Sequence, residues 1–187
     1  MKKLVLSLAL ASFAAGAIAA DTYAIDPAHT APRFEYSHFG YSNQVHRFDK
    51  TSGSITLDKA AHTASVDVSI DAKSVNTGFA LLNEHIQGED YFATAQYPTI
   101  SFKSTAVKFD GDKPVAVDGN LTIKGVTKPV TLTVTSFQAM PHPMLKKDAI
   151  GANAQARIKR SDFNMGKNAP YVSDEVTLSI SVEAIKQ

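Results

Sequence analysis

The sequence contains no cysteine and no tryptophan, and neither sign of charge is in marked excess. Without cysteine no disulfide can form, so packing must hold the fold, and both thiol catalysis and thiolate metal sites are excluded. The 19 basic and 18 acidic residues give a formal net charge of +1, which creates no long-range field for nucleic acid or an anionic membrane. The 10 Phe and 6 Tyr residues are scattered, which disfavours base stacking on single-stranded nucleic acid. We therefore expect no nucleic-acid partner.

The common catalytic and nucleotide-binding motifs are also missing. The sequence has no H-E-x-x-H, G-x-S-x-G or G-x-x-x-x-G-K-[ST], and no G-x-G-x-x-G after an expected strand, so hydrolase and nucleotide-binding functions lack their usual signals. None of the histidines has a second histidine two or four residues away, the spacing that places two imidazoles on one metal ion. They are His29, His38, His46, His62, His85 and His142. The sequence therefore predicts no catalytic residue, no cofactor and no metal site.

The first residues have the pattern of a secretory signal peptide. Two lysines at positions 2 and 3 precede an apolar stretch over 4–19, and Ala17 and Ala19 form an A-x-A cleavage site. We expect residues 1–19 to be removed by cleavage after Ala19, with Ala20 as the second choice, and the protein to be exported. An uncleaved anchor helix would need about 20 apolar residues followed by a charged stop, so we expect no stable membrane insertion.

Alternation of apolar and polar residues dominates the remaining chain, residues 20–187, which has the length of one domain. Period-2 alternation is typical of strands with one buried and one exposed face. Asp110-Gly111, Asp118-Gly119 and the stretch 125–129, which ends in a proline, are turn signals that predict hairpins in up-and-down order. The expected strands, about eight in number, include the segments 34–36, 55–57, 66–70, 100–102, 121–123, 130–134, 152–158 and 176–182.

These strands predict an all-β fold, an antiparallel eight-stranded β-barrel, because closure removes exposed sheet edges. A two-sheet sandwich is also compatible with the pattern. Alternation places Val68, Phe102, Ile123 and Leu132 on the inward face. A barrel of this size is either filled by its own side chains or holds one slender ligand, and the pattern does not choose between the two.

One segment departs from the alternation and predicts a short amphipathic helix. Between positions 77 and 88, Phe79, Leu82 and Ile86 recur at helical spacing, with polar residues at 83, 84 and 87 on the other side. Gly88 can end this helix. This helix either contributes residues to a ligand site or acts only as a lid that closes one end of the barrel.

The residues from 25 onward resemble the YceI-like family over nearly their whole length. The most specific match is the block GNLTIKGVTKPV at 119–130. The other matching segments are 25–30, Phe34 with 38–40, 74–77, 84–86 with 90–92, 97–102 with Ser104, 160–163 and the closing strand 176–184. The chain departs from the family pattern at Leu82-Asn83, where an Arg-Asp pair is common, and at Asn76-Thr77, where Asp-Thr is common. The expected pocket mouth is therefore surrounded by fewer charged residues than the family pattern has.

The resemblance implies a lipocalin-like barrel that encloses an elongated pocket for a polyisoprenoid lipid, such as an isoprenoid quinone or a prenyl phosphate. It also implies a periplasmic location, no enzymatic activity, and no cofactor apart from the bound lipid. A homodimer is compatible with it. We expect Val68, Phe102, Ile123 and Leu132 to line the pocket.

Four polar residues are candidates for the pocket mouth: Asn76, Asn83, His85 and Arg160. His85, Asn83 and Asn76 lie on or beside the expected helix, and Arg160 could meet an anionic head group. Each has a structural alternative: His85 could pack the helix, Asn83 could be solvated, and Arg160 could pair with Asp162 or another acid. Asp26, His29 and Thr30 look like a turn with side-chain hydrogen bonds to the backbone.

Two other functions compete with lipid binding. A filled barrel would suit a structural or interaction protein of the cell envelope, with the apolar, proline-rich loop 140–145 as its contact surface. An enzyme acting on lipids or quinones would need an acid-base pair facing the pocket, and no such pair can be assembled from the sequence.

Overall fold

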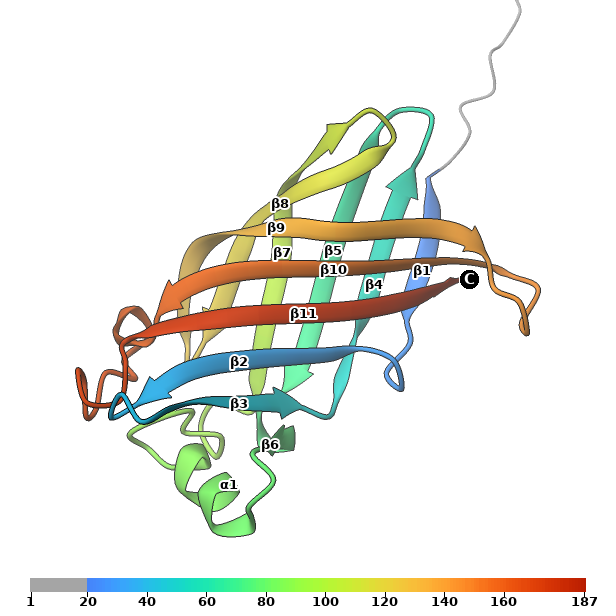
Figure 1. The fold of residues 1–187 in the computed structure, drawn as a ribbon. Coiled ribbons are helices and arrows are strands. Elements are labelled where there is room, and N and C mark those ends of the chain that lie inside the picture. The colour runs from blue at the N-terminus through green and yellow to red at the C-terminus, as the bar shows by residue number, and fades with distance from the viewer. Residues whose placement is uncertain (1–19) are drawn as a thin grey trace, which may run out of the picture.

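Eleven strands, one α-helix and two short 3-10 helices form the part of the chain that the computed structural model describes, residues 20–187 (Figure 1). The predicted signal peptide, residues 1–19, lies outside the described residues. The strands are β1 (Asp21–Ile25), β2 (Ala31–His38), β3 (Ser42–Phe48), β4 (Thr51–Asp58), β5 (Thr63–Asp71), β6 (Val75–Asn76), β7 (Thr99–Asp110), β8 (Lys113–Ile123), β9 (Val126–Pro141), β10 (Asp148–Lys159) and β11 (Glu175–Lys186). The helices are the 3-10 turns Ala72–Ser74 and Arg160–Phe163 and the α-helix α1 (Ala80–Gln87).

The strands close into one antiparallel barrel. Neighbouring strands follow the order β1-β4-β5-β7-β8-β9-β10-β11, and β11 pairs back onto β1. The edge of β11 is shared: Thr177 to Ser181 pair with β2, and Ala184 to Lys186 pair with β1. Strands β1 and β2 therefore share one of the eight positions in the barrel wall. Strands β3 and β4 share a second position, and β5 and β6 share a third. The predicted eight-stranded barrel is confirmed, and the sandwich alternative is wrong.

The turn signals proved right at Asp110-Gly111 and at Gly125, and wrong at Asp118-Gly119. Asp110-Gly111 ends β7 as expected, but Asp118 and Gly119 lie inside β8. A Cβ on Gly119 would come within 2.4 Å of the Phe102 ring, so this glycine makes room for an aromatic side chain on the neighbouring strand. Pro129 does not delay the next strand: β9 begins at Val126, after a turn in which Lys124 and Gly125 both have positive φ angles.

Helix α1 lies below the barrel wall at the end opposite the C-terminus (Figure 1). It begins at Ala80 and ends before Gly88, close to the expected bounds. Ile86 is buried and Leu82 half-buried, but Phe79 is exposed, contrary to the predicted apolar face. The reason is that Phe79 is the N-cap, with extended backbone, and precedes the helix. Among residues 20–187, no helix is long and apolar enough to cross a membrane.

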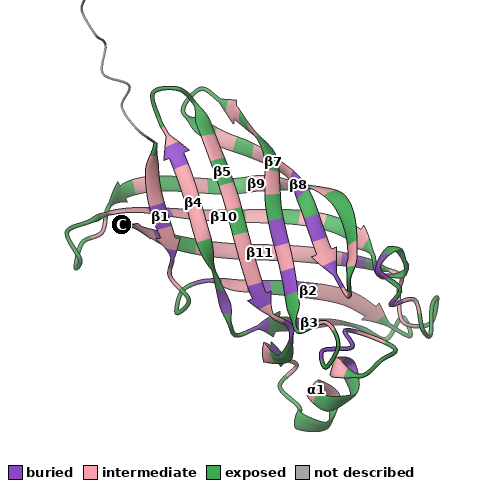
Figure 2. Cartoon of the chain, turned by 180° about the vertical axis from the view of Figure 1, so that it is seen from behind, coloured by how far each residue is buried: buried purple, intermediate pink, exposed green. Residues whose placement is uncertain are grey.

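The apolar core has two parts. The larger lies on the α1 side and contains Phe34, Phe48, Phe92 and Phe163, and the smaller is formed by Tyr23, Ile25, Leu57, Ile150 and Ala184. Buried positions recur along the strands with exposed positions between them, as alternation predicts (Figure 2). Several inward side chains of β9, β10 and β11 are only half-buried, because they border an internal space.

Candidate functional site

A cavity of about 380 Å³ lies inside the barrel, a volume typical of small-molecule sites. Its wall is built almost wholly from inward apolar side chains of the barrel strands. The four residues predicted to line it, Val68, Phe102, Ile123 and Leu132, are all among its lining residues. Their contact with a ligand stays a prediction. Val68 and Leu132 are only half-buried because the cavity takes the place of packed neighbours.

The cavity opens at the α1 end. Apart from Arg33 on β2, its exposed lining residues are His38, Phe39, His85 and Asn168. These come from the β2–β3 hairpin, from α1 and from the loop before β11. The opposite end is lined by buried residues such as Ile25, Leu57 and Ile150, which are 5 to 7% exposed. The barrel is therefore a blind pocket with one mouth.

A tyrosine-histidine pair is the main polar feature of the wall near this mouth. The Tyr36 hydroxyl lies 3.1 Å from Nε2 of His46, which is only 4% exposed. Tyr36 lines the cavity, and the His46 ring lies edge-on to Phe34 at 5.5 Å. Burial lowers the pKa of His46, and the backbone of Val45 partly offsets this, while burial raises the pKa of Tyr36. Both side chains are therefore uncharged at neutral pH.

Arg160 lines the same cavity but is occupied by its own loop. Its guanidinium donates to the backbone carbonyls of Ser173 (2.8 Å), Lys167 (2.8 Å), Val172 (2.6 Å) and Met165. Only one of the five N–H donors of an arginine is left without a partner in these bonds. Over residues 20–187 no carboxylate forms an ion pair with Arg160, so the predicted alternative of pairing with Asp162 is wrong. Arg160 holds the loop that forms one side of the mouth.

Asn76 and Asn83 lie outside the cavity wall. The Asn76 amide donates to Asp49 (2.7 Å) and accepts from the Gly78 backbone (2.9 Å). Asn83 Oδ1 accepts from both the backbone N–H and the hydroxyl of Thr77, each at 2.8 Å. Both amides are thus committed to the turn that positions α1, so Asn83 is not simply solvated.

His85 does reach the mouth. Its exposed ring lines the cavity with its centre 5.1 Å from that of Tyr91. The Tyr91 hydroxyl in turn accepts a hydrogen bond from the Asn168 amide (3.1 Å), which ties the loop before β11 to the segment after α1. The structure therefore brings together His85, Tyr91, Asn168 and Arg160 around the opening.

Sequence reasoning missed Tyr36, His46, Tyr91 and Asn168. Tyr36 belonged to an expected strand, and its period-2 relation to Phe34 could have placed it on the inward face. His46 had no such signal, because β3 shows little alternation. Asn168 lies in a loop whose path only the tertiary structure defines.

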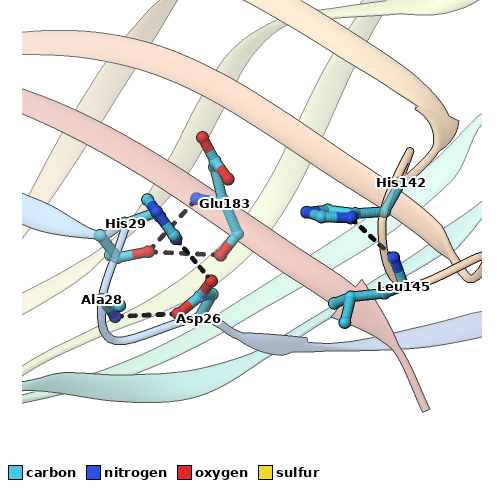
Figure 3. Close-up of polar contacts among 7 residues, drawn as sticks. Asp26, Ala28, His29, His142, Leu145 and Glu183 are labelled. Atoms are coloured by element: carbon cyan, nitrogen blue, oxygen red, sulfur yellow. Dashed lines mark hydrogen bonds and ion pairs between the residues drawn. The ribbon is translucent and has the colours of Figure 1, made fainter.

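A second polar cluster lies at the turn between β1 and β2 (Figure 3). Asp26 accepts from the Ala28 backbone and contacts His29 Nδ1, both at 2.8 Å, while the Thr30 hydroxyl donates to the Glu183 carbonyl at 3.3 Å. This confirms the predicted turn with side-chain hydrogen bonds. The side-chain atoms of Asp26, His29 and Glu183 that could coordinate a metal ion also lie within 4.8 Å of one another. Histidine spacing could not reveal this set, because β11 supplies Glu183.

Comparison with known proteins agrees with the barrel fold. The family model of the YceI-like domain matches residues 23–184. The chain belongs to the YceI-like family. Protein YceI of Escherichia coli O157:H7 is 40% identical over 192 aligned positions that cover all of both chains, and Protein YceI of Salmonella arizonae is 38% identical with the same coverage.

Solved structures share the fold of this YceI-like domain. BcnA of Burkholderia cenocepacia is 28% identical with a TM-score of 0.72, covering 86% of this chain and 99% of its own. The YceI protein of Campylobacter jejuni is 31% identical with a TM-score of 0.69, covering 81% and 90%. A polyisoprenoid binding domain from Saccharophagus degradans has a TM-score of 0.68 at 20% identity, covering 88% and 98%. At that identity the likeness concerns the fold alone.

Proposed function

We propose that this YceI-like protein binds a long-chain isoprenoid lipid inside the barrel and carries it through the periplasm, without catalysing a reaction. The observation that carries the proposal is the apolar cavity, blind at one end and open beside α1. The name of the S. degradans relative, a polyisoprenoid binding domain, supports it. The A-x-A site at Ala17 and Ala19 supports export, with residues 20–187 as the binding domain.

The physical gain is burial of the apolar tail. Each CH₂ group taken out of water contributes about 0.8 kcal/mol, and the costs of ordering the chain reduce the net affinity sharply. A tail with this hydration penalty needs a protein shell to cross an aqueous compartment. Val68, Phe102, Ile123 and Leu132 would contact the tail, and His85 and Arg160 would lie near its head.

A filled barrel that acts through its surface is the competing function. The end of β9 and the loop that follows it expose Met140, Met144 and Leu145. The Nδ1 atom of His142 accepts from the backbone N–H of Leu145, which stiffens this loop (Figure 3). This loop lies away from α1 and the mouth, so binding a partner through it would not use the cavity, whereas carrying a lipid would.

Mass spectrometry of an organic extract separates the two. We expect protein purified from the periplasm to yield a near-stoichiometric lipid, and the Leu132→Trp variant, whose indole would occupy the cavity, to yield much less. Thr133→Trp, on the adjacent exposed position of β9, is the matched control and should retain the lipid.

Thermal unfolding of the delipidated variants completes the test. In a hollow barrel Leu132→Trp should leave the apo melting temperature nearly unchanged, whereas overpacking a filled core costs about 1 to 3 kcal/mol. Ile123→Trp should behave like Leu132→Trp. Loss of apo stability in both variants, together with no lipid in the wild-type extract, would show that the carrier function is wrong.

A further inference from the structure

The polar pair Tyr36–His46 adjoins a cavity wall in which most of the lining residues are apolar. Tyr36 borders the cavity, and His46 stands behind it with its Nε2 atom 3.1 Å from the hydroxyl. The other ring nitrogen, Nδ1, is buried and makes no hydrogen bond of normal geometry within residues 20–187, although the Val45 backbone lies close enough to raise the pKa of the ring slightly. A buried polar atom without a partner costs free energy, so its retention here calls for a reason.

We propose that Tyr36 and His46 form the head-group subsite of the cavity, and that this subsite selects an uncharged oxygen-bearing head, either a carbonyl or a hydroxyl, over a phosphate. The inference rests on the proposed function, because it supposes that an isoprenoid tail fills the barrel. It assigns the residues that distinguish one isoprenoid lipid from another.

The pair can recognise both kinds of oxygen because neutral imidazole has two tautomers. With the proton on Nδ1, His46 accepts from the Tyr36 O–H, and the Tyr36 oxygen can accept from a ligand hydroxyl. With the proton on Nε2, His46 donates to the Tyr36 oxygen, and the Tyr36 O–H is free to donate to a ligand carbonyl. An Nδ1 atom without a strong partner leaves both tautomers accessible. A quinone and its quinol can therefore both form a hydrogen bond with the same subsite.

The surroundings disfavour an anionic head. Phosphate recognition needs several charged donors, as in a bidentate arginine contact. The nearby Arg160 has four donors committed to backbone carbonyls. The other basic side chains of the lining are Arg33, His38 and His85, and all three are exposed to solvent. A phosphate drawn beside Tyr36 would lose its hydration without gaining an equivalent partner.

Equilibrium binding of four probes to the delipidated protein tests the proposal. The probes are a short-chain isoprenoid quinone, its quinol, a hydrocarbon with the same tail, and the corresponding prenyl phosphate. We expect quinone and quinol to bind with Kd values within about threefold of each other, and the prenyl phosphate at least about tenfold more weakly, since an unpaired buried charge is costly.

Two variants identify the residues. Tyr36→Phe should weaken quinone and quinol about three- to tenfold, the usual worth of one hydrogen bond, and leave the hydrocarbon unchanged. His46→Phe should spare the quinone and weaken the quinol, because the Tyr36 hydrogen then loses its acceptor. Tyr41→Phe is the control, since Tyr41 is 90% exposed and outside the lining.

The outcomes separate the two proposals. If none of the probes binds, the carrier function itself is wrong. If the hydrocarbon binds but Tyr36→Phe leaves all four affinities unchanged, or the phosphate binds as tightly as the quinone, the barrel is a tail carrier and the head-group subsite proposed here is wrong.

Discussion

The two ends of this barrel are built from the same strands but use them differently. At the blind end, Tyr23, Ile25, Leu57, Ile150 and Ala184 pack into a core cluster in which every member is at most 7% exposed. At the α1 end, hydrogen bonds of Asn83, Arg160 and Asn168 hold turns and loops around an opening. Packing thus stabilises the blind end, whereas polar contacts shape the mouth.

The comparison predicts the largest stability loss at the blind end. Tyr23, 1% exposed, should be its most sensitive member, and Tyr23→Ala should cost about 3 to 5 kcal/mol, the range for deleting a buried aromatic side chain. Phe39→Ala at the mouth, where Phe39 is 51% exposed, should cost less than about 1 kcal/mol. Urea unfolding measures both, and equal losses would contradict the division between the ends.

At the mouth, the largest effect should follow loss of Arg160. Arg160→Met leaves several loop carbonyls unpaired, and we expect a cost of about 2 to 3 kcal/mol together with faster hydrogen exchange at residues 165–173. Arg160→Lys should not restore the wild type, since an ammonium lacks the fork of donors. Arg157→Met is the control, because Arg157 makes only an exposed ion pair with Glu175 at 3.0 Å, and should change stability by less than about 1 kcal/mol. Unchanged exchange in Arg160→Met would refute the loop-holding role.

A smaller effect should appear as acid sensitivity of the mouth. Burial lowers the pKa of His46 from 6.5, so below about pH 6.5 the unfolded chain takes up a proton that the folded chain resists. Stability should therefore be complete above that pH and decrease as pH falls toward the folded pKa. The hydroxyl of Tyr36 lies 3.1 Å from His46, and burial raises the pKa of Tyr36 further above this range. His46→Phe should flatten this part of the stability profile measured by urea unfolding, and an unaltered slope would assign the sensitivity elsewhere.

The smallest effect concerns the cluster of Asp26, His29 and Glu183. The Asp26–His29 contact satisfies the turn without an ion, so we expect chelators to leave the melting temperature unchanged. Elemental analysis should find no stoichiometric transition metal. A metal that is lost on chelation together with stability, and is also lost in Asp26→Asn, would make this turn a metal site.

Much of the barrel could be predicted because it depends on local patterns. Alternation in segments such as 66–70 and 176–182 assigned the inward faces of β5 and β11, and Val68, Phe102, Ile123 and Leu132 do line the cavity. Turn chemistry was less reliable. Gly119 has the sequence of a turn but serves a close contact with Phe102, and no local pattern records what lies on the neighbouring strand.

The mouth was harder to predict than the wall. Asn76 and Asn83 are predicted at the mouth because they lie beside and on the helix, yet their amides hold the turn before it. Arg160 reaches the cavity, but the loop carbonyls that occupy it follow it by 5 to 13 residues. Which donor meets which acceptor depends on the loop conformation, and that is decided by the whole mouth at once.

The sequence by itself determined eight of the strands, their inward faces and the short helix, because these follow from periodicity and hydrophobic burial along the chain. Strands β1, β3 and β6 gave no such signal. Only the tertiary structure decided which end of the barrel is closed and which polar groups meet at the other. Pairs such as Tyr36 with His46, or Tyr91 with Asn168, join separate elements. Hydrogen bonds require distances near 3 Å and aligned donors, a geometry that exists only once the barrel has closed and its loops have settled against it.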